Sequence, residues 1–131
     1  MLHTTFRLAL QAKACADRYE HFAKAVGGSR QYGMDTPIPL TSVLEINGCR
    51  DALWVLRCVL PEEEAERDRI SRLLACDYAE GKGGRILAMF EQTYPEDKRP
   101  RNAIEVSRRF AQGEATLREL RAAKATAWTA A

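Results

Sequence analysis

Apolar residues recur along this chain at the spacing of α-helices that bury one face. One stripe, at positions i, i+3, i+4 and i+7, is formed by Tyr19, Phe22, Ala23 and Val26. We find no segment with the alternating pattern of a β-strand, so the sequence predicts an all-α bundle of about six to eight short helices with no sheet. The helices are expected at residues 4–14, 16–26, 41–45, 50–60, 61–80, 85–93, 101–111 and 115–127.

Glycine, proline and small polar residues predict the ends of these helices. Pro61 and the three glutamates after it suit a first helical turn, where proline needs no amide partner and acids meet the positive end of the dipole. Thr41 or Ser42, together with Glu45, predicts a capping box for residues 41–45. Helix C-termini are expected where glycine tolerates a left-handed backbone, at Gly27-Gly28, Asn47-Gly48 and Gly113.

Two segments interrupt the helical pattern. Residues 29–39 form the longest predicted loop, because they contain Gly33, Pro37 and Pro39. Long loops often carry binding residues, so Tyr32 and Asp35 are candidate binding residues. The alternative is an ordered crossover in which Tyr32 and Ile38 pack on the domain. Residues 81–84, Gly-Lys-Gly-Gly, predict a flexible break without the pattern of a phosphate loop.

Several predicted helices have a recognisable inward face. Residues 50–60 are apolar nearly all round, which is typical of a central helix. The helix at 61–80 is expected to face inward with Ala65, Ile70, Leu73, Leu74 and either Asp77 or Tyr78. The helix at 85–93 is expected to bury Ile86, Leu87 and Phe90. The alanine-rich helix at 115–127 is expected to pack closely against several others.

The composition is that of one globular domain over residues 1–131, with 46% hydrophobic and 29% charged residues. A chain of this length can fold without a metal or a disulfide. Its net charge of +2 is too small for a general nucleic-acid binder. We find neither a signal peptide nor an apolar run that could span a membrane, so we expect a cytoplasmic protein with no membrane partner.

The cysteines and histidines do not form a metal-binding pattern. The four cysteines include no CxxC pair and there are only two histidines, so no metal or other cofactor is predicted. Without export the thiols should stay reduced, and Cys58 and Cys76 lie in apolar stretches where burial is expected. A catalytic nucleophile needs a neighbouring base, and no spacing favours Cys15 with His21. No catalytic residue is therefore predicted.

Charge is segregated along the chain. Residues 62–80 contain seven acids and three bases, a net charge of −4. Residues 98–124 contain eight bases and three acids, a net charge of +5. The two segments could dock on each other, face different partners, or form solvated helix faces whose ion pairs contribute little.

Lys98-Arg99-Pro100-Arg101 places three cations at a predicted helix start, where the dipole disfavours them. Lys98, Arg99 and Arg101 are therefore candidate binding residues for a phosphate or an acidic partner, unless nearby acids neutralise them. Asp77 lies on an apolar side of its predicted helix, and a buried carboxylate there is expected to pair with Arg99 or Arg101. Such a group could be a structural ion pair or line a polar binding pocket.

A longer set of segments resembles a known family. The resemblance begins near residue 27, and its strongest part lies between residues 51 and 114. The main segments there are Asp51-Ala52-Leu53-Trp54, Cys76-Asp77-Tyr78-Ala79-Glu80, Tyr94-Pro95-Glu96-Asp97-Lys98-Arg99-Pro100-Arg101 and Phe110-Ala111-Gln112-Gly113-Glu114. They resemble the Imm-5-like putative immunity proteins of bacteria and phages, although residues 81–84 depart from that pattern. The resemblance implies a non-catalytic protein that binds and neutralises a toxin or effector.

Other functions remain open beside this one. A phage anti-defence inhibitor, such as an anti-CRISPR protein, would use the same kind of surface against a host nuclease complex. An enzyme would need Asp77, Arg99 and Arg101 in one polar pocket. A small-molecule-binding or nucleic-acid-binding helical domain is a further alternative, and the latter would use the basic segment 98–124. We therefore expect a protein partner, with nucleic acid less favoured.

Overall fold

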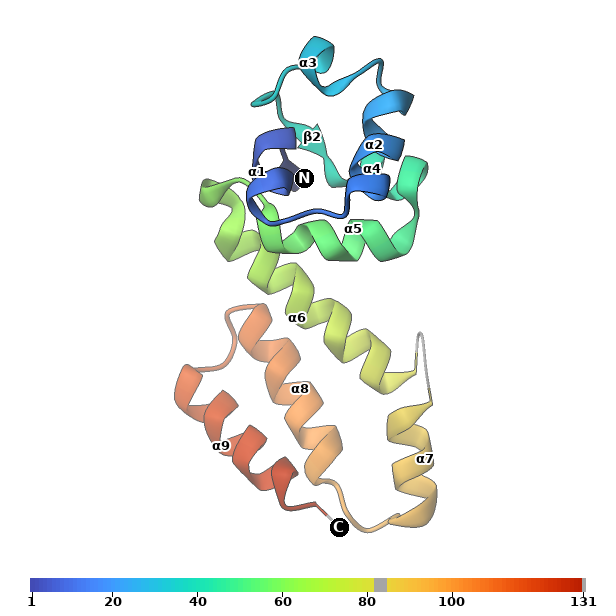
Figure 1. Ribbon diagram of the computed structural model, residues 1–131. Helices are drawn as coiled ribbons and strands as arrows, with labels where there is room; N and C mark the ends of the chain where they lie inside the picture. Colours follow the sequence, from blue (N-terminus) through green and yellow to red (C-terminus); the bar gives the residue numbers. More distant parts are fainter. Residues whose placement is uncertain (82–84, 131) are drawn as a thin grey trace. The chain divides into compact units, whose positions relative to one another are not determined.

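The apolar stripes form α-helices in a computed structural model of the chain, which describes residues 1–81 and 85–130 (Figure 1). These residues form nine α-helices, two short 3₁₀ helices and one two-stranded sheet. The predicted helical class is therefore confirmed, whereas the absence of a sheet and the count of six to eight helices were wrong. The chain divides into an N-terminal unit, Met1–Arg67, and a C-terminal unit, Asp68–Ala131. The single domain over residues 1–131 stays a prediction.

The N-terminal unit contains short elements. Its strands are β1 (His3–Thr4) and β2 (Ile38–Pro39), and its 3₁₀ helices are Leu56–Cys58 and Pro61–Glu63. Its helices are α1 (Phe6–Gln11), α2 (Ala16–Ala25), α3 (Ser29–Tyr32), α4 (Leu40–Asn47) and α5 (Cys49–Val55). Helix α6 (Glu64–Glu80) begins in this unit and continues into the next.

The sheet was missed because each strand has only two residues, too few for an alternating pattern. β1 and β2 pair antiparallel, with His3 opposite Pro39 and Thr4 opposite Ile38. The amide of Leu40 donates to the carbonyl of Leu2 at 3.0 Å beside this pair. The hydroxyl of Thr4 donates to the carbonyl of Cys58 at 2.6 Å, which satisfies a buried polar group.

Local capping explains where the first helices depart from the predicted boundaries. α1 begins at Phe6, two residues later than expected, because Thr5 accepts from the amide of Leu8 at 3.1 Å and residues 3–4 are extended. The predicted capping box at residues 41–45 was wrong, since α4 starts at Leu40 without a side-chain cap. The predicted loop at 29–39 contains α3 and β2. The glycines that end α2 and α4 behave as predicted, with φ of +86° at both Gly27 and Gly48.

Aromatic packing builds the core of the N-terminal unit. The ring of Phe6 lies 5.2 Å from that of Tyr19, 5.8 Å from that of Phe22 and 5.9 Å from that of Tyr32, and all three contacts are tilted or edge-on. The predicted central helix at 50–60 is α5 followed by a 3₁₀ turn, and it contributes residues to this core. The buried members of the cluster are Phe6, Phe22, Ala23, Ile38, Val43, Val55 and Cys58.

The C-terminal unit contains most of α6, then α7 (Ile86–Thr93), α8 (Arg99–Ala111) and α9 (Leu117–Trp128). α8 and α9 lie side by side and run in opposite directions, so the start of α8 meets the end of α9 (Figure 1). The connection between them ends in a capping box, in which Thr116 and Glu119 exchange hydrogen bonds. Among the described residues of this unit, the buried hydrophobic ones are Cys76, Leu87, Ala111 and Ala123.

Three residues predicted to face inward are exposed: Ala65, Tyr78 and Ile86. Leu87 is 4% exposed, whereas its neighbour Ile86 is 72% exposed. Successive helical residues point about 100° apart, so burying Leu87 turns Ile86 toward solvent. The same rotation separates buried Cys76 from Tyr78, which is exposed. The predicted flexible break lies outside the described residues except for Gly81.

Candidate functional site

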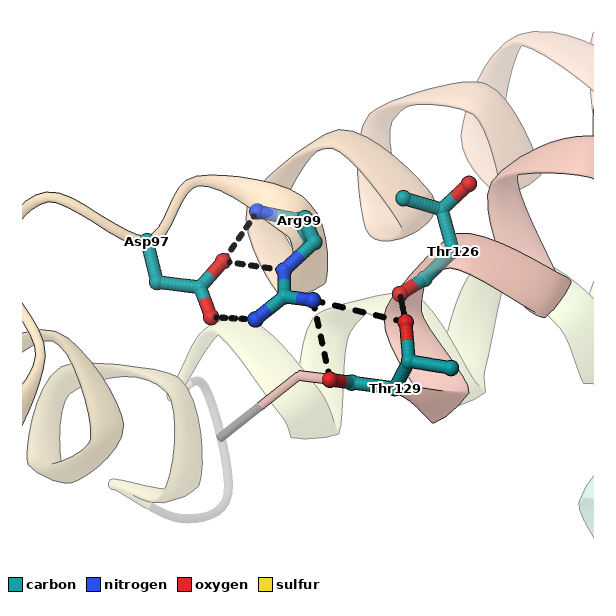
Figure 2. Close-up of polar contacts among 4 residues, drawn as sticks. All are labelled: Asp97, Arg99, Thr126 and Thr129. Carbon is teal, nitrogen blue, oxygen red and sulfur yellow. Dashed lines mark hydrogen bonds and ion pairs between the residues drawn. The ribbon is translucent and has the colours of Figure 1, made fainter.

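Arg99, one of the three candidate cations, is held by an acid at the start of α8. Its Nε donates to Asp97 Oδ1 at 2.8 Å and its Nη2 donates to Asp97 Oδ2 at 2.6 Å (Figure 2). The Arg99 amide also donates to Asp97 Oδ1 at 3.0 Å. Asp97 thus places a negative charge at the positive end of α8, which explains how cations are tolerated there. This contact holds the pKa of Asp97 below, and that of Arg99 above, its ordinary value.

The same guanidinium connects the two helices. Arg99 Nη1 donates to the backbone carbonyl of Thr129 at 2.8 Å, just beyond the last residue of α9 (Figure 2). It also lies 3.3 Å from the Thr129 hydroxyl, which in turn donates to the Thr126 carbonyl at 2.9 Å. Because both edges of the guanidinium are engaged, Arg99 has a structural role and is a poor candidate for binding a separate anion.

Arg101 is engaged in the same way with α7. Its Nε and Nη2 donate to the two carboxylate oxygens of Glu91 at 2.6 Å and 2.7 Å. These bonds hold the pKa of Glu91 below its ordinary value and raise that of Arg101. Lys98 is exposed and forms no ion pair with another described residue. The predicted basic cluster therefore contributes a single available cation.

Asp77 does not pair with Arg99 or Arg101, so that prediction was wrong. Its Oδ1 accepts from Arg108 Nη1 at 3.0 Å, and Arg108 Nη2 also donates to Glu80 at 2.6 Å. Arg108 lies nine residues beyond Arg99 on α8, a distance of about 13 Å along the helix axis. Asp77 therefore faces the other end of α8. The three residues of the predicted polar pocket have three different partners.

Tyr32 and Asp35 belong to the N-terminal unit, and their contacts are with other residues of that unit. Asp35 accepts from Arg7 Nε at 2.6 Å and Nη2 at 2.9 Å, which lowers its pKa. The Tyr32 ring packs against Phe6, and its hydroxyl donates to the carbonyl of Pro37 at 3.5 Å. These contacts favour the ordered crossover over a binding loop.

The sequence did not predict a groove between α6, α8 and α9 of the C-terminal unit, with a volume of about 670 Å³. We call it the alanine groove, because small side chains line it from all three helices: Ala75, Ala79, Ala103 and Ala127. Small side chains let a partner backbone approach closely. Trp128 also lines it and is 85% exposed, a large apolar surface for a helix end.

Three cations line the alanine groove, and among the described residues none of them forms an ion pair with an acid. The guanidinium of Arg72 lies over the ring of Phe110 at 5.0 Å, which leaves its charge uncompensated. Arg121 and Lys124 are exposed. On α9 these two and Trp128 follow the spacing i, i+3, i+7, a signal readable from the sequence. Three of the four alanines, Ala75, Ala79 and Ala103, come from the other two helices.

The described residues contain no group of three His, Cys, Asp or Glu that could hold a metal ion. The described helices include none that is long and apolar enough to cross a membrane. The burial predicted for Cys58 and Cys76 is confirmed, at 6% and 4% exposure. Burial raises the pKa of the Cys58 thiol, against the hydrogen bond from Thr4.

The chain is thus a small helical protein with a groove lined by alanines and cations. A family model described as Imm-5 like putative immunity protein matches residues 63–131. The chain belongs to this family, as its segments suggested. The match includes the whole C-terminal unit and hence the alanine groove, whereas residues 27–62 of the resemblance lie outside it. Neither the curated proteins nor the solved structures contain a match.

Proposed function

We propose that this protein is an immunity-type protein that neutralises a toxin or effector by binding it at the alanine groove. The observation that carries the proposal is the groove's set of three cations without an acid partner among the described residues. The groove also lies within the residues that match the family. The family supports binding to another protein. The charge and shape of the alanine groove support that groove as the binding site.

The chemistry of the groove specifies an acidic partner. Arg72, Arg121 and Lys124 would face carboxylates, while the alanines and Trp128 would bury apolar side chains between those carboxylates. Complementary charge increases the association rate and rejects basic surfaces, which suits a protein that must find one toxin quickly. An acidic amphipathic helix is the partner element that fits a groove lined by small side chains. The proposal places the protein in the cytoplasm, where its thiols stay reduced.

The experiment is co-expression of this protein with the products of its neighbouring genes in a heterologous host. We expect one of those products to arrest growth, and this protein to restore growth and form a stable complex in size-exclusion chromatography. Changing Arg121→Glu and Lys124→Glu together should abolish rescue and weaken the complex at least tenfold. The matched control is Arg30→Glu with Arg118→Glu, which changes the net charge equally, and neither residue lines the groove.

Each outcome decides one part of the proposal. If no neighbouring product is toxic or binds, the immunity function is wrong. If this protein instead allows a phage to escape a host nuclease complex, the anti-defence alternative replaces it. Rescue that survives the groove variant but is lost in the control would keep the function and remove the groove as its site.

A further inference from the structure

A second hollow lies in the N-terminal unit between α1, α2, α4 and α5. Its volume is about 550 Å³, within the range of sites that bind small molecules. Its apolar lining includes four aromatic side chains from three helices, namely Phe6, Tyr19, Phe22 and Trp54. Interiors of folded proteins are close-packed, so a hollow of this size beside an aromatic core is an unusual feature. We call it the aromatic cavity.

One part of its lining is a polar network that joins α2 to α4 and α5, in which the buried Asn47 Oδ1 has no hydrogen-bond partner among the described residues. Arg18 Nε donates to Asp51 Oδ2 at 2.7 Å, and Arg18 Nη2 donates to the backbone carbonyl of Asn47 at 2.7 Å. Asn47 Nδ2 donates to Asp51 Oδ2 at 2.8 Å and to the Arg18 carbonyl at 3.0 Å. Both partners of Nδ2 are acceptors, so the network fixes the Asn47 amide. The charges of Arg18 and Asp51 compensate each other.

Arg50 is the remaining charged residue of the lining. It is exposed at the second position of α5, and among the described residues it has no ion pair. With Arg18 and Asp51 compensated, the lining has a net charge of about +1 located at Arg50. A guanidinium offers paired donors that match the two oxygens of a carboxylate. The cavity therefore combines an apolar body with one anion-binding group near its edge.

We infer that the aromatic cavity binds a small carboxylic acid with an apolar body. The aromatic side chains would enclose the hydrocarbon part, and Arg50 would face the carboxylate. The lining is preorganised, because Trp54 carries the guanidinium of Arg57 at 4.8 Å from its ring and the Arg18 network joins α2 to α4 and α5. This site goes beyond the proposed toxin binding, since its lining lies entirely outside the residues matched by the family.

The test uses octanoate as the probe and 1-octanol as its neutral counterpart. The Trp128→Phe variant leaves Trp54 as the only tryptophan, so its fluorescence reports on the cavity. We expect a saturable change with octanoate, half-complete below about 1 mM for a ligand of this size. Arg50→Gln should weaken octanoate binding by about fivefold, as expected for a partly exposed ion pair, and leave 1-octanol binding unchanged. Arg30→Gln, a matched control away from the cavity, should change neither.

Filling the cavity provides the second variant. Ala9 lines the aromatic cavity from α1, and Ala9→Phe should reduce octanoate binding at least tenfold while the helical circular dichroism is retained. When octanoate is added to the protein without the Ala9 and Arg50 substitutions, the nuclear magnetic resonance chemical shifts that change should belong to residues of α1, α2, α4 and α5. Absence of saturation at 5 mM, or shifts confined to other helices, would overturn the site even if a variant failed to fold. Equal binding of octanoate and 1-octanol, unaffected by Arg50→Gln, would overturn the choice of a carboxylate.

Discussion

The guanidinium of Arg99 and the carboxylate of Asp97, two residues apart, meet through two nearly parallel hydrogen bonds of 2.8 and 2.6 Å. This geometry leaves Arg99 Nη1 directed at the carbonyl of Thr129. The pairing with Asp97 at the start of α8 therefore orients the hydrogen bond that Arg99 donates to the residue after α9. Arg99, one of the candidate binding residues, therefore connects two helices. Three of the cations that have no acid partner among the described residues lie instead on α6 and α9, at the alanine groove.

Removing the charge of Asp97 tests this connection. In Asp97→Asn the carboxylate no longer orients Arg99, so we expect a lower thermal midpoint and faster amide exchange near Thr129. The decrease should be smaller than that of a core truncation such as Leu87→Ala, because the Arg99 side chain is partly exposed. Glu96→Gln is the control, since the described residues give Glu96 no hydrogen bond. An unchanged exchange rate at Thr129 would show that the contact is not formed in solution.

Acid should destabilise the fold in a definite pH range. The pKa values of Asp97 and Glu91 are lowered, through hydrogen bonds from Arg99 and Arg101, from ordinary values of 3.8 and 4.5. A carboxyl with a lowered folded pKa releases its proton on folding, so its contribution is present above the ordinary pKa and lost as pH falls through the folded one. Urea midpoints should thus be nearly constant from pH 5 to 7 and fall below about pH 4.

The double variant Asp97→Asn/Glu91→Gln provides the comparison for that acid range. It should be less stable at pH 7 and should lose less of its remaining stability on acidification, because two of the titrating groups are gone. Parallel curves for the variant and the native sequence would contradict the assignment of the two lowered pKa values.

The capping box of α9 should contribute measurably to stability. Thr116→Ala removes the hydroxyl that accepts from the amide of Glu119 at 3.2 Å and leaves that amide without its partner. We expect the free energy of unfolding to decrease by about 1 kcal/mol, measured by urea denaturation. Thr116→Ser retains a hydroxyl and should restore most of the loss. If serine and alanine were equally destabilising, the methyl group rather than the cap would be responsible.

The four thiols should react in two classes. Cys15 and Cys49 are exposed, whereas Cys58 and Cys76 are buried. A thiol reagent such as Ellman's reagent should modify two groups quickly in the native protein and four after unfolding, because only an accessible thiolate reacts. Cys58 should be slowed further, since burial raises its pKa. Cys15→Ser/Cys49→Ser should remove the fast class, and a fast class that persists would contradict the burial.

The sequence by itself determined the features set within a few neighbouring residues. The stripe that begins at Tyr19 produced α2, and Gly27 and Gly48 ended helices where glycine permits a left-handed backbone. Apolar surroundings predicted buried Cys58 and Cys76. The family was also readable, because it depends on the order of residues rather than on their contacts. These signals are local, so the spacing along the chain carries them.

Only the tertiary structure decided which distant residues meet. β1 and β2 are two residues each and owe their form to pairing with each other across 34 positions, which no local pattern encodes. Asp77 pairs with Arg108 and not with Arg99, because the C-terminal end of α8, where Arg108 lies, is the end that meets Asp77 of α6. The alanine groove and the aromatic cavity likewise combine side chains from three or more helices. Helix formation depends on neighbours along the chain, whereas a site depends on how the helices pack, and that packing was not encoded in any single stripe.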